Sequence, residues 1–257
     1  MPTMTDTDKD RLFVTALARG LDVLSAFDGT AARMTNLQLA SRTGLPKSTV
    51  SRLTYTLTQL GYLNAVDNGY TLGFRVLALA AAQLNRFELR TLAAPLMREF
   101  ADRHQVSCSL ATDDGVEMVY LECTRSSARV TVQLSVGSHV PMTRTAIGRA
   151  WLAGLEAAER DRVFARLGQH YGEAWPAEAA RIETALAQYR QRGFTSSYGD
   201  YDDEVVAVGV PIAPMLQGQP KLAINASSPA YQISQERMEQ DIAPDLVALA
   251  DRLSGRA

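Results

Sequence analysis

Residues 35–73 have the sequence TNLQLASRTGLPKSTVSRLTYTLTQLGYLNAVDNGYTLG. Thr35 and Gln38 have the spacing of a capping box, in which each side chain accepts a hydrogen bond from the other residue's backbone at the start of a helix. This first helix is expected to end at Gly44. Pro46 predicts the start of a second helix, because a proline in the first helical turn loses no hydrogen bond and already has a helical φ.

The second helix is expected to extend to about Gln59 and to be amphipathic. Its apolar residues are three, four and three positions apart and form a stripe that must face a small core: Val50, Leu53, Leu57 and Leu60. The opposite face carries hydrogen-bonding side chains: Ser48, Ser51, Arg52, Tyr55 and Gln59. An ordinary helix with one face in water would show the same pattern, so the helix alone does not decide the function.

Two short runs with β propensity follow, at residues 63–66 and 70–72, on either side of Asp67-Asn68-Gly69. Asn-Gly between such runs is a strong signal for a hairpin. Upstream, four apolar residues predict the additional helix that so small a core needs: Val14, Leu17, Leu21 and Leu24. Helix, tight turn, helix and hairpin are the layout of a winged helix-turn-helix, whose second helix enters the major groove of DNA. The residues predicted to reach DNA are Lys47, Ser48, Thr49, Ser51, Arg52 and Tyr55.

The segment TGLPKSTVSRLTYTLTQLGYL, followed by YTLG, closely resembles the IclR-type family of bacterial transcriptional regulators, and the resemblance covers about residues 17–253. It implies an α+β protein with an N-terminal winged helix-turn-helix, a linker helix and a C-terminal effector-binding domain with a GAF-like α/β fold. The expected boundaries are a disordered start at 1–10, the DNA-binding domain at 11–73, the linker at 74–86 and the effector-binding domain at 87–257. Thr71 stands where many members carry a basic residue, and Asp67 lies at the hairpin tip, so the wing is expected to add little phosphate binding.

The charge is unevenly distributed along the chain. The whole protein has a net charge of −2, but residues 11–75 contain seven basic and three acidic side chains. Such a local excess attracts the phosphate backbone of DNA. Because the positive charge of one copy is modest, useful affinity for DNA is expected to need two DNA-binding domains on a palindromic site. No run is long and apolar enough for a membrane span and the start MPTMTDTDKD is no signal peptide, so a cytoplasmic location is expected.

The linker segment FRVLALAAAQL, residues 74–84, is apolar nearly all round. Such a helix must be buried, and its counterpart in a second subunit is the partner that we expect. The alternative is that it packs only within its own chain. The resemblance favours the first reading, since members of the family form homodimers and often dimers of dimers.

The rest of the chain mixes helices and strands. Helices are expected at about 88–103, 145–155, 157–167 and 178–192, and strands at about 106–112, 116–123, 129–134, 194–198, 204–212 and 221–226. A last helical region, 234–253, should be kinked or divided at Pro244. Strands joined mostly as hairpins, with interleaved helices, predict an antiparallel sheet that helices cover on one face.

The best indication of a ligand site is LAINASSP, residues 222–229. On a strand, Asn225 and Ser227 share a face with Ala223, which leaves room for a polar small molecule. A solvent-facing edge strand would look the same. The resemblance implies a pocket, and the residues that it places around an effector are Ala146, Ile147, Gly148, Asp202, Ile212, Asn225 and Ser227. Members of the family often have a cysteine in place of Ile212 and a serine in place of Asn225.

Arg144 suggests what kind of effector binds. A guanidinium at the mouth of a cavity, close to a helix that starts near Thr145, would hold a carboxylate in a bidentate manner. We therefore hypothesise a small organic acid. The alternative is a surface arginine paired with a nearby acid such as Glu122.

An enzyme is the competing class, and no catalytic residue, metal site or cofactor is predicted. The three histidines His104, His139 and His170 have no metal-binding spacing, and no GxSxG, Walker or GxGxxG motif is present. Cys108 and Cys123 are expected to be reduced thiols on strands, with a redox switch as the alternative. We therefore predict an effector-controlled DNA-binding regulator. The alternative is a small-molecule-modifying enzyme, or an effector-binding module with a vestigial DNA-binding head. Whether transcription rises or falls, and through which operator and effector, stays open.

Overall fold

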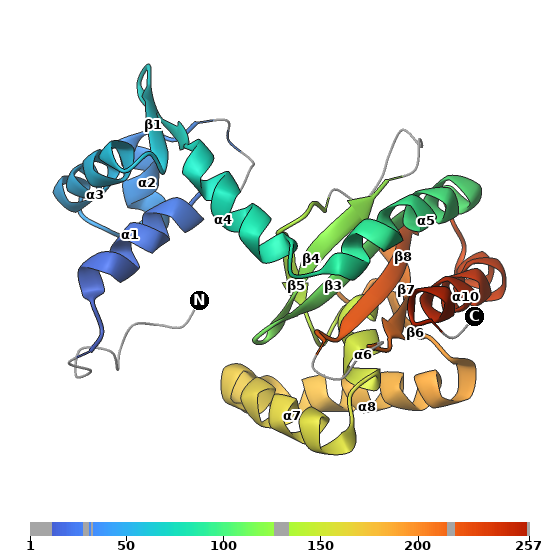
Figure 1. The fold of residues 1–257 in the computed structure, drawn as a ribbon. Coiled ribbons are helices and arrows are strands. Elements are labelled where there is room, and N and C mark those ends of the chain that lie inside the picture. Colours follow the sequence, from blue (N-terminus) through green and yellow to red (C-terminus); the bar gives the residue numbers. More distant parts are fainter. Residues whose placement is uncertain (1–11, 28–30, 32, 126–133, 215–218, 256–257) are drawn as a thin grey trace. The chain divides into compact units, whose positions relative to one another are not determined.

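The computed structural model describes residues 12–27, 31, 33–125, 134–214 and 219–255 (Figure 1). The chain divides into two compact units, residues 1–86 and 87–257. Within the described ranges, no helix has the length and apolar character that crossing a membrane requires. The expected disorder at 1–10 and most of the expected strand at 129–134 lie outside these ranges.

The N-terminal unit has the predicted order of helices and strands. It consists of α1 (Thr15–Ser25), α2 (Asn36–Thr43), α3 (Lys47–Gln59), β1 (Leu63–Val66), β2 (Gly69–Leu72) and α4 (Phe74–Leu84). The capping box at the start of α2 is confirmed, because the Gln38 N–H donates to Thr35 Oγ1 at 3.2 Å and the Thr35 N–H donates to Gln38 Oε1 at 2.8 Å. Gly44 ends α2 with a left-handed φ of 68°.

The hairpin forms one residue earlier than the Asn-Gly signal suggested. Leu63 pairs with Leu72 and Val66 pairs with Gly69, so the loop is Asp67-Asn68, with Asn68 at φ 59°. Gly69 belongs to β2 instead, where a Cβ would lie 2.7 Å from the carbonyl oxygen of Met34. That close approach is a backbone pairing of Met34 with Tyr70, which ties the hairpin to the segment that precedes α2.

The predicted apolar stripes are confirmed in part, since Val50 is buried and Leu24, Leu53 and Leu57 pack against the core of this unit. Its buried residues are Val23, Met34, Leu39, Val50 and Leu63. Val14, Leu17 and Leu21 of the expected α1 stripe are 61%, 62% and 54% exposed, because α1 packs against its neighbours through the face that carries Val23. Leu60 is exposed as well. Thr54 is buried in α3, where its hydroxyl donates to the carbonyl of Val50.

The C-terminal unit is built on a six-stranded antiparallel sheet in the order β5-β4-β3-β8-β7-β6. Its strands are β3 (Ser107–Asp114), β4 (Glu117–Thr124), β5 (His139–Pro141), β6 (Thr195–Tyr198), β7 (Val205–Ile212) and β8 (Leu222–Pro229). Its helices are α5 (Glu88–His104), α6 (Ala146–Ala153), α7 (Ala157–Tyr171), α8 (Trp175–Arg192), α9 (Gln235–Arg237) and α10 (Ala243–Leu253), with a 3₁₀ turn at Gly172–Ala174 and a π turn at Met238–Ile242. The short strand β5 was not predicted. Pro244 lies in the first turn of α10 and divides the last helical region, as expected.

Helices cover both faces of the sheet, so the expectation of one covered face is wrong. Figure 1 shows α5 and α10 on one side and α6, with α7 and α8 behind it, on the other. A Cβ on Gly209 would lie 2.5 Å from the carbonyl oxygen of Ala146, so this residue of β7 faces α6. Asn225 is directly opposite Gly209 in β8 and faces the same way. Nearly all residues of β7 and β8 are buried, and a sheet of this kind must be covered twice.

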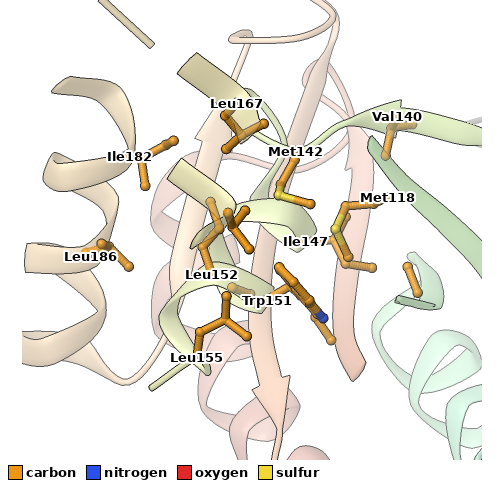
Figure 2. Close-up of a cluster of buried hydrophobic side chains, with 14 of the residues drawn as sticks. Met118, Val140, Met142, Ile147, Trp151, Leu152, Leu155, Leu167, Ile182 and Leu186 are labelled. Atoms are coloured by element: carbon orange, nitrogen blue, oxygen red, sulfur yellow. The ribbon is translucent and has the colours of Figure 1, made fainter. Parts of the chain in front are cut away.

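Helix α6 lies at the centre of the larger core (Figure 2). Ile147, Trp151 and Leu152 of α6 pack with side chains from the sheet on one side and from α7 and α8 on the other. Those neighbours are Met118, Val140, Leu167, Ile182 and Leu186, and Met142 joins them from the segment between β5 and α6. All residues of α6 from Ala146 to Leu152 are buried, so the sheet and the outer helices fix its position closely.

We predict that Gly148→Ala destabilises the protein by about 1–3 kcal/mol, because a methyl group on Gly148 would overlap the backbone of Met142. Gly168→Ala in α7 is the matched control, since a methyl there makes ordinary contacts with Trp175 and raises helix propensity. Urea unfolding measures both changes. An unchanged midpoint for Gly148→Ala would contradict the close packing of α6.

Candidate functional site

The polar face of α3 is exposed, as the sequence predicted. Lys47, Ser48, Ser51, Arg52 and Tyr55 are exposed, with Tyr55 at 66%, and Thr49 is half-buried. The large ring of Tyr55 and the cations of Lys47 and Arg52 on one exposed helix face indicate a binding surface for another molecule.

The cations of this face are free to bind a partner. Lys47 and Arg52 have neither a hydrogen bond nor an ion pair with any residue in the described part of the chain. Ser51 is partly engaged, since the amide of Asn36 in α2 lies 3.4 Å from its hydroxyl. The same Asn36 accepts a hydrogen bond from Thr54 and so fixes α2 against α3.

The hairpin carries a basic contact that the sequence did not reveal. Arg33 donates from Nη1 to the carbonyl oxygen of Asp67 at 2.9 Å, and both residues are exposed. A cation therefore lies at the wing turn although Thr71 and Asp67 contribute none. The two residues are 34 positions apart, so only the backbone pairing at Met34 could have indicated this contact.

An apolar groove of about 680 Å³ runs along the same unit between α1, α3 and α4. Its apolar lining is Leu17, Leu21, Leu24, Leu53, Leu57, Leu60, Tyr62 and Leu79. Thr49 and Arg52 lie at its border with the exposed face of α3. No residue of α4 is buried, and Phe74 and Leu77 are 86% and 65% exposed. The described chain therefore does not bury this helix by itself.

A cavity of about 290 Å³ lies in the C-terminal unit, at the start of α6. Of the predicted effector residues it brings together Ala146, Asp202, Asn225 and Ser227. The rest of its lining is Tyr120, Leu134, Val140, Thr145, Ser197, Tyr201, Val205 and Ala207. Seven of these eight come from strands or loops whose sequence has no polar pattern distinctive enough to predict them, and Thr145 was expected only as the start of a helix.

Four of the predicted residues lie outside this lining. Ile147 points into the core in Figure 2, and Gly148 lies against the backbone of Met142. Ile212 is buried at the end of β7, opposite Leu222. Because successive residues of a helix turn by about 100°, Ala146 alone of the three predicted α6 residues reaches the cavity.

Arg144, the fourth of them, is bound by a carboxylate of its own chain. Its Nε and Nη2 donate to Glu178 Oε1 at 3.0 and 2.6 Å. Glu178 is buried, which by itself raises its pKa, but the hydrogen bonds from Arg144 and Thr143 outweigh the burial and lower the pKa. The partner is thus Glu178, whereas Glu122 pairs with Arg90 at 2.9 Å. Among the described lining residues of the cavity, Asp202 is the one with a charged side chain.

The cavity wall contains a buried acceptor without a partner. Asn225 is 5% exposed, and its Oδ1 has no hydrogen bond within the described residues. An unpaired buried acceptor costs about 1–3 kcal/mol, so such a group indicates a place where a ligand or water donates. Burial raises the pKa of Tyr120, so this phenol lines the cavity as a protonated hydroxyl. The wall thus offers acceptors on Asp202 and Asn225, and hydroxyl donors around them.

The residues weighed for catalysis are occupied elsewhere. His104 pairs with Asp245 at 2.9 Å and His139 pairs with Asp114 at 2.8 Å. Burial raises the pKa of Cys108 and of Cys123, so both thiols stay protonated, and the strand register places them on opposite faces of the sheet. Within the described ranges, no three histidine, cysteine or acidic side chains gather as a metal site would require.

Comparison with known proteins decides the family. A model described as the IclR helix-turn-helix domain matches residues 16–67, and one described as the C-terminal domain of bacterial transcriptional regulator IclR matches residues 81–255. The chain belongs to the IclR family. It is 33% identical over 237 residues to the HTH-type transcriptional regulator TsaQ1/TsaQ2 of Comamonas testosteroni, a match that covers 91% of this chain and 84% of the relative.

Solved structures of the family have the same fold. An IclR family transcriptional regulator from Brucella abortus has a TM-score of 0.76 and 34% identity, with 100% of both chains covered. An IclR homologue from Microbacterium hydrocarbonoxydans, crystallised with 4-hydroxybenzoate, has a TM-score of 0.73 and 23% identity, covering 94% of this chain and 100% of that one. The expected α+β fold with a helix-turn-helix domain and a C-terminal effector-binding domain is confirmed. The protein is a DNA-binding transcriptional regulator and not an enzyme.

Proposed function

We propose that this IclR-family protein acts as a homodimer that reads a palindromic operator with two copies of α3 and responds to a small hydroxylated organic acid. Two observations support the proposal. The first is the exposed face of α3, whose Lys47 and Arg52 have no partner among the described residues. The second is the unpaired buried acceptor of Asn225 in the wall of the cavity.

The exposed face of α3, from its first residue to Tyr55, supplies the contacts to DNA. Its predicted residues Lys47, Ser48, Thr49, Ser51, Arg52 and Tyr55 combine cations with hydroxyl groups. Base edges in the major groove are read by such side chains, and phosphates attract the cations. Arg33 at the wing turn adds a phosphate contact that compensates for Thr71.

The dimer forms through apolar side chains of the N-terminal unit. Helix α4 has no buried residue, and Leu17 and Leu21 of α1 border the groove that also includes Leu79. Apolar surface of this extent is covered in soluble proteins, and a two-fold axis covers the same face of both copies at once. Dimerisation also places two DNA-binding domains on one site, which compensates for the modest positive charge of each.

The effector has both hydroxyl and acid groups. Asp202 and Asn225 Oδ1 accept hydrogen bonds, so they bind a hydroxyl of the ligand. A carboxylate then lies near the hydroxyl groups of Tyr201 and Ser227, held by neutral donors and by the start of α6 rather than by Arg144, which Glu178 occupies. The ligand 4-hydroxybenzoate, bound by the Microbacterium relative, combines the same two groups.

Arg52→Ala is expected to weaken binding to a genomic DNA fragment that the wild type retains by about ten- to a hundredfold, as for loss of one base or phosphate contact. Gel shift at fixed ionic strength measures the effect. Arg162→Ala, which removes an exposed cation from α7, should leave the affinity for DNA unchanged. An equal loss in both variants would contradict the role of α3.

Asp202→Asn and Ser227→Ala are expected to weaken effector binding by about tenfold or more, because each removes a polar contact in the cavity. The ligand is first selected by thermal shift from hydroxylated organic acids and their neutral analogues, and its affinity is then measured by calorimetry. Asp203→Asn changes an exposed neighbour outside the lining and should bind as the wild type does. Unchanged binding in Asp202→Asn, or a preference for the neutral analogues, would overturn the assignment.

Leu77→Glu is expected to halve the molar mass of the protein in solution, because the added carboxylate would be buried in the dimer interface. Light scattering after size exclusion measures the mass. Gln83→Glu adds the same charge to an exposed polar position of α4 and should keep the wild-type mass. A wild-type monomer at micromolar concentration would refute the dimer.

A further inference from the structure

Another cavity of the C-terminal unit, of about 300 Å³, lies between α6, α8 and the edge strand β6. Its polar lining includes Arg149, Arg181, Thr184, Gln188, Ser196 and Asp200. It shares no lining residue with the cavity of about 290 Å³ at the start of α6, which we call the effector cavity. We call it the arginine groove.

Arg149 is buried at the base of the arginine groove and is held in one position. Its Nε donates to the carbonyl of Thr143 at 2.9 Å, and its Nη1 donates to the carbonyl of Ser196 at 2.8 Å and to Asp200 Oδ2 at 2.7 Å. Its Nη2 has no hydrogen bond with the described residues and is not one of the fully buried atoms. Because Arg149 lines the groove, this nitrogen is the part of the guanidinium that remains available to a ligand there.

Arg181 shares the same carboxylate from the other side. Its Nη1 lies 3.4 Å from Asp200 Oδ1, and its side chain is 48% exposed. The adjacent Arg144 and Glu178 neutralise each other, as their ion pair shows. Two guanidinium groups therefore face one carboxylate, and the groove keeps one positive charge in excess.

We propose that the arginine groove binds a small oxyanion, a carboxylate or phosphate group, between Nη2 of Arg149 and the free nitrogens of Arg181. Planar guanidinium groups bind such anions through paired, charge-assisted hydrogen bonds. A rigid, buried arginine loses little conformational freedom on binding, which favours the complex. The amide of Gln188 supplies a neutral donor beside them.

The anion also affects the effector cavity, an extension that rests on the proposed function. Asp200 belongs to the loop of residues 199–204, whose Tyr201 and Asp202 line the effector cavity. An anion in the arginine groove adds a second negative charge beside Asp200 and so weakens the attraction of both arginines for the loop that carries Asp200. Binding of the anion therefore lowers affinity for the effector, and by reciprocity the effector weakens the anion.

The binding test uses the full chain, with calorimetric titration of sodium phosphate or sodium acetate against sodium chloride at equal ionic strength. Saturable binding of one oxyanion per chain is expected in the wild type. Arg181→Gln should weaken it by roughly fivefold or more, a modest change because this arginine is half exposed. Arg190→Gln removes the same charge from an exposed position on the opposite side of α8 and should bind as the wild type does.

Binding of phosphate alone would indicate a phosphorylated ligand, and binding of both oxyanions a carboxylate-sized site. No saturation beyond the chloride control, or equal loss in Arg181→Gln and Arg190→Gln, would overturn the proposal. These titrations need no effector, so failure to find an effector would count against the proposed function alone. Once an effector is known, phosphate at a concentration that half-fills the wild-type groove should lower effector affinity more in the wild type than in Arg181→Gln; an equal decrease in both would refute the coupling.

Discussion

The close approach of α6 to the sheet is the constraint on which the C-terminal unit depends. Gly209 has no Cβ, and the carbonyl of Ala146 occupies the space that a Cβ would need. Gly148, two residues after Ala146, lies closer still to its neighbour, since a Cβ there would overlap the carbonyl oxygen of Met142. Two absent side chains thus fix the first turn of α6 against β7 and against the segment before it. The effector cavity is the space left where this turn passes Asn225 and Ser227.

Buried ion pairs hold the same turn from outside. Burial of a charge is costly unless the partner and its hydrogen bonds compensate. Glu178 has that compensation, since the hydrogen bonds from Arg144 and Thr143 lower its pKa despite burial, and donating to Glu178 raises the pKa of Arg144. Arg149 is held by three acceptors. Because these charges pair with one another and do not line the cavity at the start of α6, that cavity is lined mostly by hydroxyl and apolar groups.

Local sequence signals predicted local structure well. The capping box at Thr35, the stop at Gly44 and the hairpin after α3 depend on neighbouring residues, and the structure contains all three. The cavity-lining position of Asn225 and Ser227 on β8 also follows from strand alternation. The partner of Arg144 could not be predicted, because Glu178 is 34 positions away and only the fold brings it near. Periodicity likewise identified the apolar residues of α1 but could not tell which side faces its own chain: Val23 is buried and Leu17 is exposed.

The exposed apolar faces connect stability with control of DNA binding. The N-terminal unit has a small core, and a core of that size stabilises a domain only marginally. In the proposed dimer, the apolar surface on α1 and α4 that a second copy covers would add to the stability of the same unit that carries α3. The energy of pairing would then also fix the spacing of the two DNA-binding domains. A ligand can change operator affinity only by the difference in its own affinity for two spacings of the DNA-binding domains. A rigid α4 paired with its counterpart would transmit that difference from the cavity to the DNA-binding domains.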